Sequence, residues 1–438
     1  MYGAAALALA VPFLFSHDRY QPGIELPGGI DVAPSDLAVG ALVVLALVGS
    51  RGRLTSVLRA GAAAYVVIAA FLLWIGIELV LPELRGRSYD LGSHLVSAAA
   101  FVEYALLAAA VPLLIRGRRE LTLAAGALVA WSGVATAFGL VQFLGVDMAE
   151  ASPLGHRQPS FVGYQDFAAL SGGAAVLGFA AVALGSNVLP RRVAAFAAFA
   201  GLLGLGLSGS LAAEAGMVAA AGLVLLLAGR RGGLGRRDGV VLVAGLAASV
   251  VLTFAVRGGD LNQFVRFVGL LPAETTTEED VQTFSHRTLL GYLGVRVFAS
   301  DPLLGAGWHA TNEYVTLAPY LDDARRRFPA ITPEAFPSPE LPYGIQNSWI
   351  QSAADLGAPG FLLFGLALLV PIWLGARRIP RAPPTAAFCA ATGSGMLVVC
   401  AGIWTAQGLV PAIPTDALMW LGVAFVVMGA SGDDARLD

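Results

Sequence analysis

Lysine is absent from this 438-residue sequence, so all 27 basic residues are arginine. Charge of either sign is scarce: charged residues make up 13% of the chain, against roughly 25% in soluble globular proteins. The formal net charge is −3, which provides no basic field and excludes nucleic acid as an expected partner. The two cysteines, Cys389 and Cys400, lie about three helical turns apart in one apolar run, so we expect packing residues rather than a disulfide.

Motifs for binding metals and nucleotides are also missing from the sequence. The five histidines are scattered, with no His-Glu-x-x-His pair and no Cys cluster, so we expect neither a metal nor another cofactor. The sequence contains no nucleotide-binding loop. An enzyme that transfers a sugar would therefore need a donor without a nucleotide, and a sugar carried on a lipid diphosphate would serve.

What the sequence has instead is long apolar runs. Hydrophobic residues make up 57% of it, and the mean hydropathy is +0.72. Because a membrane-spanning helix needs about 20 apolar residues, the pattern predicts an all-α polytopic membrane protein with about 12 transmembrane helices. The runs are 3–15, 36–50, 60–81, 94–115, 121–144, 166–187, 193–208, 211–229, 239–256, 347–375, 385–408 and 413–430.

These runs divide the chain into three parts. Residues 1–256 are predicted to form transmembrane helices 1–9, and residues 347–438 to form helices 10–12 with a short cytoplasmic tail. Residues 257–346 are the one long polar segment, predicted to be a large extracytoplasmic loop. We interpret the start of the chain as a retained span, because no basic segment precedes its apolar core and no small-residue cleavage site follows it.

The distribution of arginine predicts the orientation. Sixteen arginines fall in alternate connections and near the end of the chain, whereas the short connections on the other side hold four. Because positive charge accumulates in cytoplasmic connections, we expect both termini in the cytoplasm. The remaining seven arginines lie in the long segment, and long loops are largely exempt from this bias.

Two arginines on the outer side are candidates for binding phosphate. Residues 286–299 have the pattern of an amphipathic helix that can lie at the membrane interface, with Arg287 at the edge of its apolar face. Arg157 lies in a short outer connection, where the charge bias disfavours it. A guanidinium group binds phosphate oxygens in bidentate fashion. For each arginine the alternative is a lipid headgroup contact or a solvated charge.

Three polar residues within the apolar runs are candidates for lining a cavity. Gln351 and Asp355 share one face of the run 347–375, and Glu214 lies near the outer end of its run. Polar groups at such depth are costly and usually face a cavity or one another. Interhelical hydrogen bonding is the alternative interpretation.

His309 is a candidate general base. It ends the Gly-rich stretch 302–309, next to Trp308, where an aromatic ring beside an imidazole suits a bound sugar. A single histidine in a loop is also often structural, and that alternative stays open.

The end of the long segment resembles the O-antigen ligase/polymerase superfamily of bacterial envelope glycan enzymes, with the ligase branch closest in layout. The ligase signature is His, then Asn, Ser or Gln, nine residues, Gly, two residues, and Gly, Thr or Tyr. This sequence fits at every position except the first, with Gln346, Asn347, Gly357 and Gly360. The family's outer loop also carries an Arg-led helix followed by a Pro-Leu-x-Gly-x-Gly turn, and residues 287–307 are similar.

The resemblance implies a metal-independent, inverting glycosyltransferase in the bacterial cytoplasmic (inner) membrane. The donor would be a glycan on undecaprenyl diphosphate, a polyprenyl-diphosphate carrier, and the acceptor a glycan or glycolipid on the outer side. In the family, arginines hold the diphosphate and a histidine is proposed to activate the acceptor hydroxyl.

Two positions depart from the family pattern. The signature histidine is Gln346 here, and the arginine of a Ser-Arg pair at the start of run eight is Leu211. Our hypothesis is that His309 supplies the base, with Gln346 and Asn347 in the catalytic site. Arg287 and Arg157 would then bind the diphosphate.

Other functions stay open at this point. A polymerase of lipid-linked repeat units would need the same donor site. A transporter would show internal symmetry and broken helices, which we do not detect in the sequence. A non-catalytic relative is the third alternative, because of Gln346 and Leu211.

Overall fold

We describe the protein from a computed structural model. It describes the whole chain except residues 1, 17–20, 27–29, 50–51, 149–150, 153–154, 233, 268–269, 271–283 and 431–438. Parts of the predicted outer loop and the predicted cytoplasmic tail therefore lie outside the described residues.

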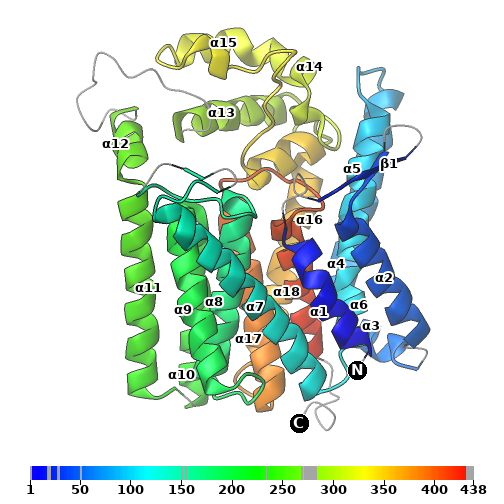
Figure 1. The fold of residues 1–438 in the computed structure, drawn as a ribbon. Coiled ribbons are helices and arrows are strands. Elements are labelled where there is room, and N and C mark those ends of the chain that lie inside the picture. Colours follow the sequence, from blue (N-terminus) through cyan, green and yellow to red (C-terminus); the bar gives the residue numbers. More distant parts are fainter. Residues whose placement is uncertain are drawn as a thin grey trace.

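The described chain is a bundle of helices (Figure 1). Nine helical segments have the length and composition of a membrane span, and a bent helix pair makes up to ten. Two shorter apolar helices complete the set, and each of the twelve predicted runs corresponds to one of these segments. The segments are α1 (Tyr2–Leu14), α2 (Pro34–Gly49) with α3 (Leu54–Ala60), α4 (Ala62–Leu84), α5 (Leu91–Ala105) with α6 (Leu107–Leu114), α7 (Arg118–Phe143), α8 (Tyr164–Ala183), α9 (Arg191–Ser208), α10 (Leu211–Arg231), α11 (Arg236–Val256), α16 (Ser348–Arg378), α17 (Pro384–Ile403) and α18 (Pro414–Ala430).

One small sheet adds to the all-α prediction. Strands β1 (Ile24–Leu26) and β2 (Ile30–Val32) pair antiparallel between α1 and α2. In the ladder, Ile24 lies opposite Val32.

The centre of the bundle is formed by α8, α17 and α18, which are almost entirely buried. Small residues allow α8 and α9 to approach closely: a Cβ on Gly201 would lie 2.5 Å from the backbone nitrogen of Ala175. Without a hydrophobic driving force between helices in lipid, such close van der Waals packing is a main source of association. In contrast, only four residues of α11 are buried, so most of that helix faces outward.

The described part of the long polar segment folds as a helical layer across one end of the bundle, and we call it the outer layer (Figure 1). It contains α12 (Gly258–Phe267), α13 (Phe284–Ser300), the 3-10 turn η2 (Ala310–Asn312), α14 (Tyr314–Leu317) and α15 (Leu321–Arg327). We call the end of the bundle that α13 and α15 cover the loop face, and the other end the opposite face. The amphipathic helix predicted over 286–299 is α13, and its apolar side packs on residues of the same layer such as Leu317, Leu321 and Phe336.

Candidate functional site

A pocket of about 740 Å³ opens at the loop face, where the helical layer meets the bundle. Three guanidinium groups line it, those of Arg257, Arg287 and Arg327, and none of its described lining residues is Asp, Glu or His. We call it the arginine pocket. Its lining is Gln165, Ser210, Leu211, Ala212, Arg257, Phe284, Arg287, Thr288, Gly291, Tyr292, Val295, Arg327, Phe328, Asn347, Ile350, Thr405 and Ala406.

Arg287 enters the pocket from the first turn of α13. Its Nε donates a hydrogen bond to Oε1 of Gln346 at 3.0 Å. Gln346 is the residue that stands where the family signature has histidine, so in this chain that position holds a guanidinium group in place. The predicted phosphate-binding residue and a predicted catalytic residue are therefore direct partners.

Asn347 joins two elements at the floor of the pocket. Its side-chain oxygen accepts a hydrogen bond from the backbone nitrogen of Ile350 at 3.0 Å and so caps the N-terminus of α16. Its Nδ2 donates to the carbonyl oxygen of Thr405 at 3.0 Å. Both bonds give the side chain a structural role, while its position exposes it to the pocket.

Arg257 is, with Arg327, one of the pocket residues that sequence reasoning missed. It directly follows α11, is 4% exposed, and its guanidinium carbon lies 5.0 Å from the ring centroid of Phe284. A Cβ on Gly209 would lie 3.3 Å from Cγ of Arg257, so Arg257 reaches the α9–α10 turn beside Leu211. The signal in the sequence is the position of Arg257 directly after the apolar run 239–256, at the border of the long polar segment.

Arg157 lies beside the pocket rather than in its lining. Its guanidinium carbon is 4.2 Å from the ring centroid of Tyr164, a cation–π contact. Its Cβ lies close to Gly209, whose φ of +61° and lack of a side chain accommodate it. Arg157 thus packs behind the α9–α10 turn that borders the pocket.

The arginine triplet of α15 divides between two environments. Arg325 and Arg326 form ion pairs with Asp322 and Asp323, at 3.1 and 3.3 Å. Arg327 instead lines the arginine pocket, with its guanidinium carbon 5.8 Å from the ring centroid of Tyr292.

The three predicted cavity residues lie elsewhere, and each connects two elements. Glu214 accepts hydrogen bonds from the hydroxyls of Ser249 and Thr253 of α11, at 3.1 and 3.0 Å. Oε1 of Gln351 accepts the backbone nitrogen of Leu409 at 2.7 Å. Oδ1 of Asp355 accepts the backbone nitrogen of Thr311 at 2.9 Å. None of the three lines the arginine pocket.

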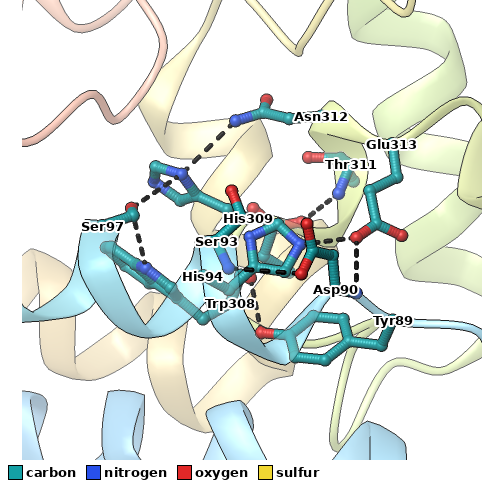
Figure 2. A network of polar contacts seen from close by, with 11 residues as sticks. Tyr89, Asp90, Ser93, His94, Ser97, Trp308, His309, Thr311, Asn312 and Glu313 are labelled. Atoms are coloured by element: carbon teal, nitrogen blue, oxygen red, sulfur yellow. Dashed lines mark hydrogen bonds and ion pairs between the residues drawn. The ribbon is translucent and has the colours of Figure 1, made fainter. Parts of the chain in front are cut away.

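His309 belongs to a separate polar cluster, which we call the His309 network (Figure 2). It joins the outer layer to the start of α5. Nε2 of His94 lies 2.7 Å from Oε1 of Glu313, which also accepts the backbone nitrogen of Asp90 at 3.0 Å. The drawn members include Tyr89, Asp90, Ser93, His94, Ser97, Trp308, His309, Thr311, Asn312 and Glu313.

Two polar groups approach Nδ1 of His309 in this network. Trp308 donates its Nε1–H to the Ser97 hydroxyl at 3.2 Å, so the hydroxyl hydrogen is available for Nδ1 of His309 at 3.1 Å. Nδ2 of Asn312 also approaches Nδ1, at 3.4 Å. Nδ1 of His309 thus faces a hydroxyl and an amide nitrogen, both of which can donate to it.

The surroundings of His309 oppose protonation. The residue is 6% exposed and its ring stacks on Trp308, with centroids 4.3 Å apart. Burial, with a smaller contribution from the nearby His94, lowers the pKa of His309 to about 4. A histidine with such a pKa is a weak base at neutral pH, and it does not line the arginine pocket.

The Pro-Leu-x-Gly-x-Gly turn (residues 302–307) and the signature glycines (Gly357 and Gly360) meet at a break in α16. Gly357 has φ +65° and ψ −174°, a conformation that only glycine adopts readily. A Cβ on Gly357 would lie 2.4 Å from the carbonyl oxygen of Leu303, and one on Gly305 would lie 2.5 Å from the nitrogen of Gly357. The glycines of both motifs thus let two backbones touch.

Backbone hydrogen bonds join the two motifs at this contact, which we call the glycine clasp. The nitrogens of Ala306 and Gly307 donate to the carbonyl oxygens of Ala354 and Asp355, at 2.9 and 2.8 Å. The nitrogen of Ala358 donates to the carbonyl oxygen of Pro302 at 2.8 Å. The clasp fixes the outer layer to α16, and the motif glycines serve the architecture of the site rather than its chemistry.

Arg85 and Arg87 reinforce the same junction. Both contact Oδ2 of Asp301, at 2.5 and 2.8 Å, and Arg87 also donates to the carbonyl oxygen of Gly305 at 3.0 Å. These contacts give a structural reason for two of the four arginines in the short connections that the sequence analysis predicts to be outside.

Comparison with known families identifies the region that holds this site. Residues 196–365 match the family model described as O-antigen ligase. The match runs from α9 into α16 and includes Arg257, Arg287, Gln346 and both glycine motifs. The resemblance stated from the sequence is confirmed over this range, and the protein is a membrane protein with an O-antigen ligase domain. No curated protein shows significant similarity to the chain.

Proposed function

We propose that this protein transfers a glycan from a polyprenyl-diphosphate carrier to an acceptor, with the carrier's diphosphate bound in the arginine pocket. The loop face would then be the extracytoplasmic face, and the opposite face, where α10 and α16 end in arginine, would be cytoplasmic. The acceptor would be a glycan or glycolipid.

The observation that carries the proposal is the convergence of Arg257 and Arg287 on one pocket at the end of the membrane-spanning helices. Arg257 directly follows α11 and Arg287 lies on α13, 30 positions later in the sequence. A guanidinium group presents a planar set of donors that matches phosphate oxygens and stays charged at any physiological pH. Two such groups suit a diphosphate, and Arg327 extends the positive lining towards the outer layer.

Gln346 has a positioning role in this proposal. Its amide oxygen accepts a hydrogen bond from Nε of Arg287 and so helps to fix the guanidinium group beside the pocket. The substitution of glutamine for the family histidine then alters how the acceptor is deprotonated while it preserves how the donor is held.

The reaction would be an inverting displacement. An acceptor hydroxyl attacks the anomeric carbon, and the bond from that carbon to the diphosphate oxygen breaks. The polyprenyl diphosphate leaves with the electron pair, and the arginines stabilise the negative charge that develops on it. The hydroxyl proton passes to water in the pocket, because the described lining offers no imidazole or carboxylate.

Replacement of the pocket arginines tests the proposal. In reconstituted membranes with a lipid-linked glycan donor, Arg287→Ala and Arg257→Ala should each lower kcat/KM about 100-fold, because each removes a group that stabilises the leaving diphosphate. Arg296→Ala is the matched control for Arg287, since Arg296 lies on α13 but pairs with Asp323 outside the pocket. Unchanged turnover in both pocket variants would refute the diphosphate site.

Ligase and polymerase activities share this donor site and differ in the acceptor. Glycan profiling of a deletion strain separates them: full-length polymer that stays on the lipid carrier indicates a ligase, and shortened polymer indicates a polymerase. An unaltered profile, with donor still bound by the purified protein, would indicate a non-catalytic relative.

A further inference from the structure

A second large cavity lies on the side of the bundle, between α9 and α11. It encloses about 620 Å³, and we call it the α9–α11 groove. It is lined by Val182, Arg191, Ala195, Ala198, Phe199, Leu202, Leu203, Arg237, Asp238, Val241, Leu242, Gly245, Ala248, Ser249 and Leu252. Apart from the three charged residues near its opposite-face end and one serine, every lining side chain is apolar or glycine.

Small residues make the groove hollow, and its one serine is directed into the protein. Gly245 and Ala248 contribute little side-chain volume to the lining on α11, and Gly245 lets the Leu202 side chain of α9 approach closely, since a Cβ there would lie 3.2 Å from it. The hydroxyl of Ser249 lies 2.8 Å from the carbonyl oxygen of Leu202 and 3.1 Å from Oε2 of Glu214. The groove therefore presents hydrocarbon to its occupant.

The length of the groove constrains what fills it. On α11 the lining extends from Arg237 to Leu252, which at 1.5 Å per residue is about 23 Å. Each leaflet of a bilayer contributes about 15 Å of hydrocarbon, half of a core about 30 Å thick. A groove of this length crosses the midplane, so the acyl chain of a phospholipid from one leaflet would fill only part of it.

The loop-face end of the groove points towards the arginine pocket. Leu252 rests against Gly206, where a Cβ would lie 2.7 Å from the leucine side chain, so α9 and α11 touch there. Arg257 directly follows α11, five residues after Leu252, which is about 8 Å along the helix axis. A lipid whose charged head binds at Arg257 would therefore enter the groove by passing over Leu252.

We propose that the α9–α11 groove binds the long isoprenoid chain of the carrier whose diphosphate head occupies the arginine pocket. The inference rests on the proposed function for the head group, and it adds a separate site that selects carriers by chain length. Arg191 and Asp238, paired at 2.8 Å, close the charged end of the groove, which leaves its apolar length for the chain.

Two adjacent alanines allow a matched test. Ala248 lines the groove and Ala247 does not, although both are exposed on α11. Purified full-length protein in lipid nanodiscs would be tested with three probes: undecaprenyl diphosphate, the short-chain farnesyl diphosphate, and inorganic diphosphate. Ala248→Trp should weaken binding of undecaprenyl diphosphate roughly tenfold, because the indole displaces part of the chain. Ala247→Trp should leave it unchanged, and neither variant should alter binding of inorganic diphosphate.

The outcomes separate this inference from the proposed function. Equal affinity for undecaprenyl diphosphate in the two tryptophan variants would overturn the groove assignment, whatever the head-group result. A loss of retained phospholipid in Ala248→Trp, with undecaprenyl diphosphate affinity unchanged, would also overturn it and assign the groove to bulk lipid. Failure of wild-type protein to bind inorganic diphosphate, or an Arg257→Ala variant that binds all three probes normally, would instead contradict the proposed function.

Discussion

The arginine pocket and the His309 network lie at the same face of the bundle and are organised in opposite ways. In the network, Trp308, Ser97 and Asn312 direct their polar groups at Nδ1 of His309 or at each other. In the pocket, three guanidinium groups border an open volume of about 740 Å³. A dense group of reactive residue types is thus a structural junction here, whereas arginines scattered along the sequence form the cavity.

The difference has a physical cause. Buried polar groups that satisfy one another stabilise a contact, and the low surrounding dielectric makes each of them costly to disturb. A ligand site requires instead that like charges be held together around a cavity by the rest of the fold. The network and the glycine clasp supply that support, because they fix the outer layer from which Arg287 and Arg327 enter the pocket.

The largest expected effect comes from breaking the glycine clasp. Gly357→Ala would place a Cβ 2.4 Å from the carbonyl oxygen of Leu303 and force a non-glycine residue into a strained conformation. We expect a loss of at least about 3 kcal/mol of stability, or no folded protein. Size-exclusion chromatography and thermal unfolding in detergent measure it. Gly222→Ala, on α10 with open space around its Cβ, is the control and should be tolerated; equal behaviour of the two variants would show that the clasp is dispensable.

A smaller effect is expected in the pH dependence of stability, to which His309 of the network should contribute. The pKa of His309 is lowered from 6.5 to about 4 in the folded protein, so between these values the unfolded chain binds more protons. Stability should therefore fall as pH is lowered below 6.5, and at pH 5 this residue should account for roughly 2 kcal/mol of the loss.

Thermal unfolding of His309→Asn across pH 7 to 5 measures this contribution. Asparagine tolerates the left-handed backbone of this position, where φ is +60°. The variant should have a flatter pH dependence than the wild type, whereas His156→Asn, at an exposed histidine, should keep the wild-type slope. An unchanged slope in His309→Asn would show that the imidazole does not stay neutral through burial.

The smallest effect should come from the hydrogen bond that links Gln346 to Arg287. Gln346→Ala should lower kcat/KM roughly tenfold, the typical contribution of one hydrogen bond to a charged group. Gln346→His should restore most of it, because a neutral imidazole nitrogen can accept the bond from Nε. Transfer assays with matched unfolding curves check both, and an alanine variant with full activity would remove the positioning role.

Sequence reasoning located the elements well and their contacts poorly. All twelve apolar runs and the amphipathic helix containing Arg287 appear as helices, because hydrophobic length and periodicity are local properties. The hydrogen-bond partners of Gln351 and Asp355 could not be predicted from the helix face that the two residues share. That face meets the turn at Leu409 and the outer layer at Thr311, so its polar groups bond to backbone instead of lining the pocket.

The sequence by itself determined that this chain lies in a membrane and carries one large polar segment on one side, since both follow from the amount and spacing of apolar residues. It also determined the family resemblance, because the glycine spacing survives where the signature histidine does not. Only the tertiary structure decided that Arg257 reaches the pocket with Arg287, and that His309 is enclosed away from it. The reason is that which side chains meet depends on how separate helices pack, and no local pattern encodes that contact.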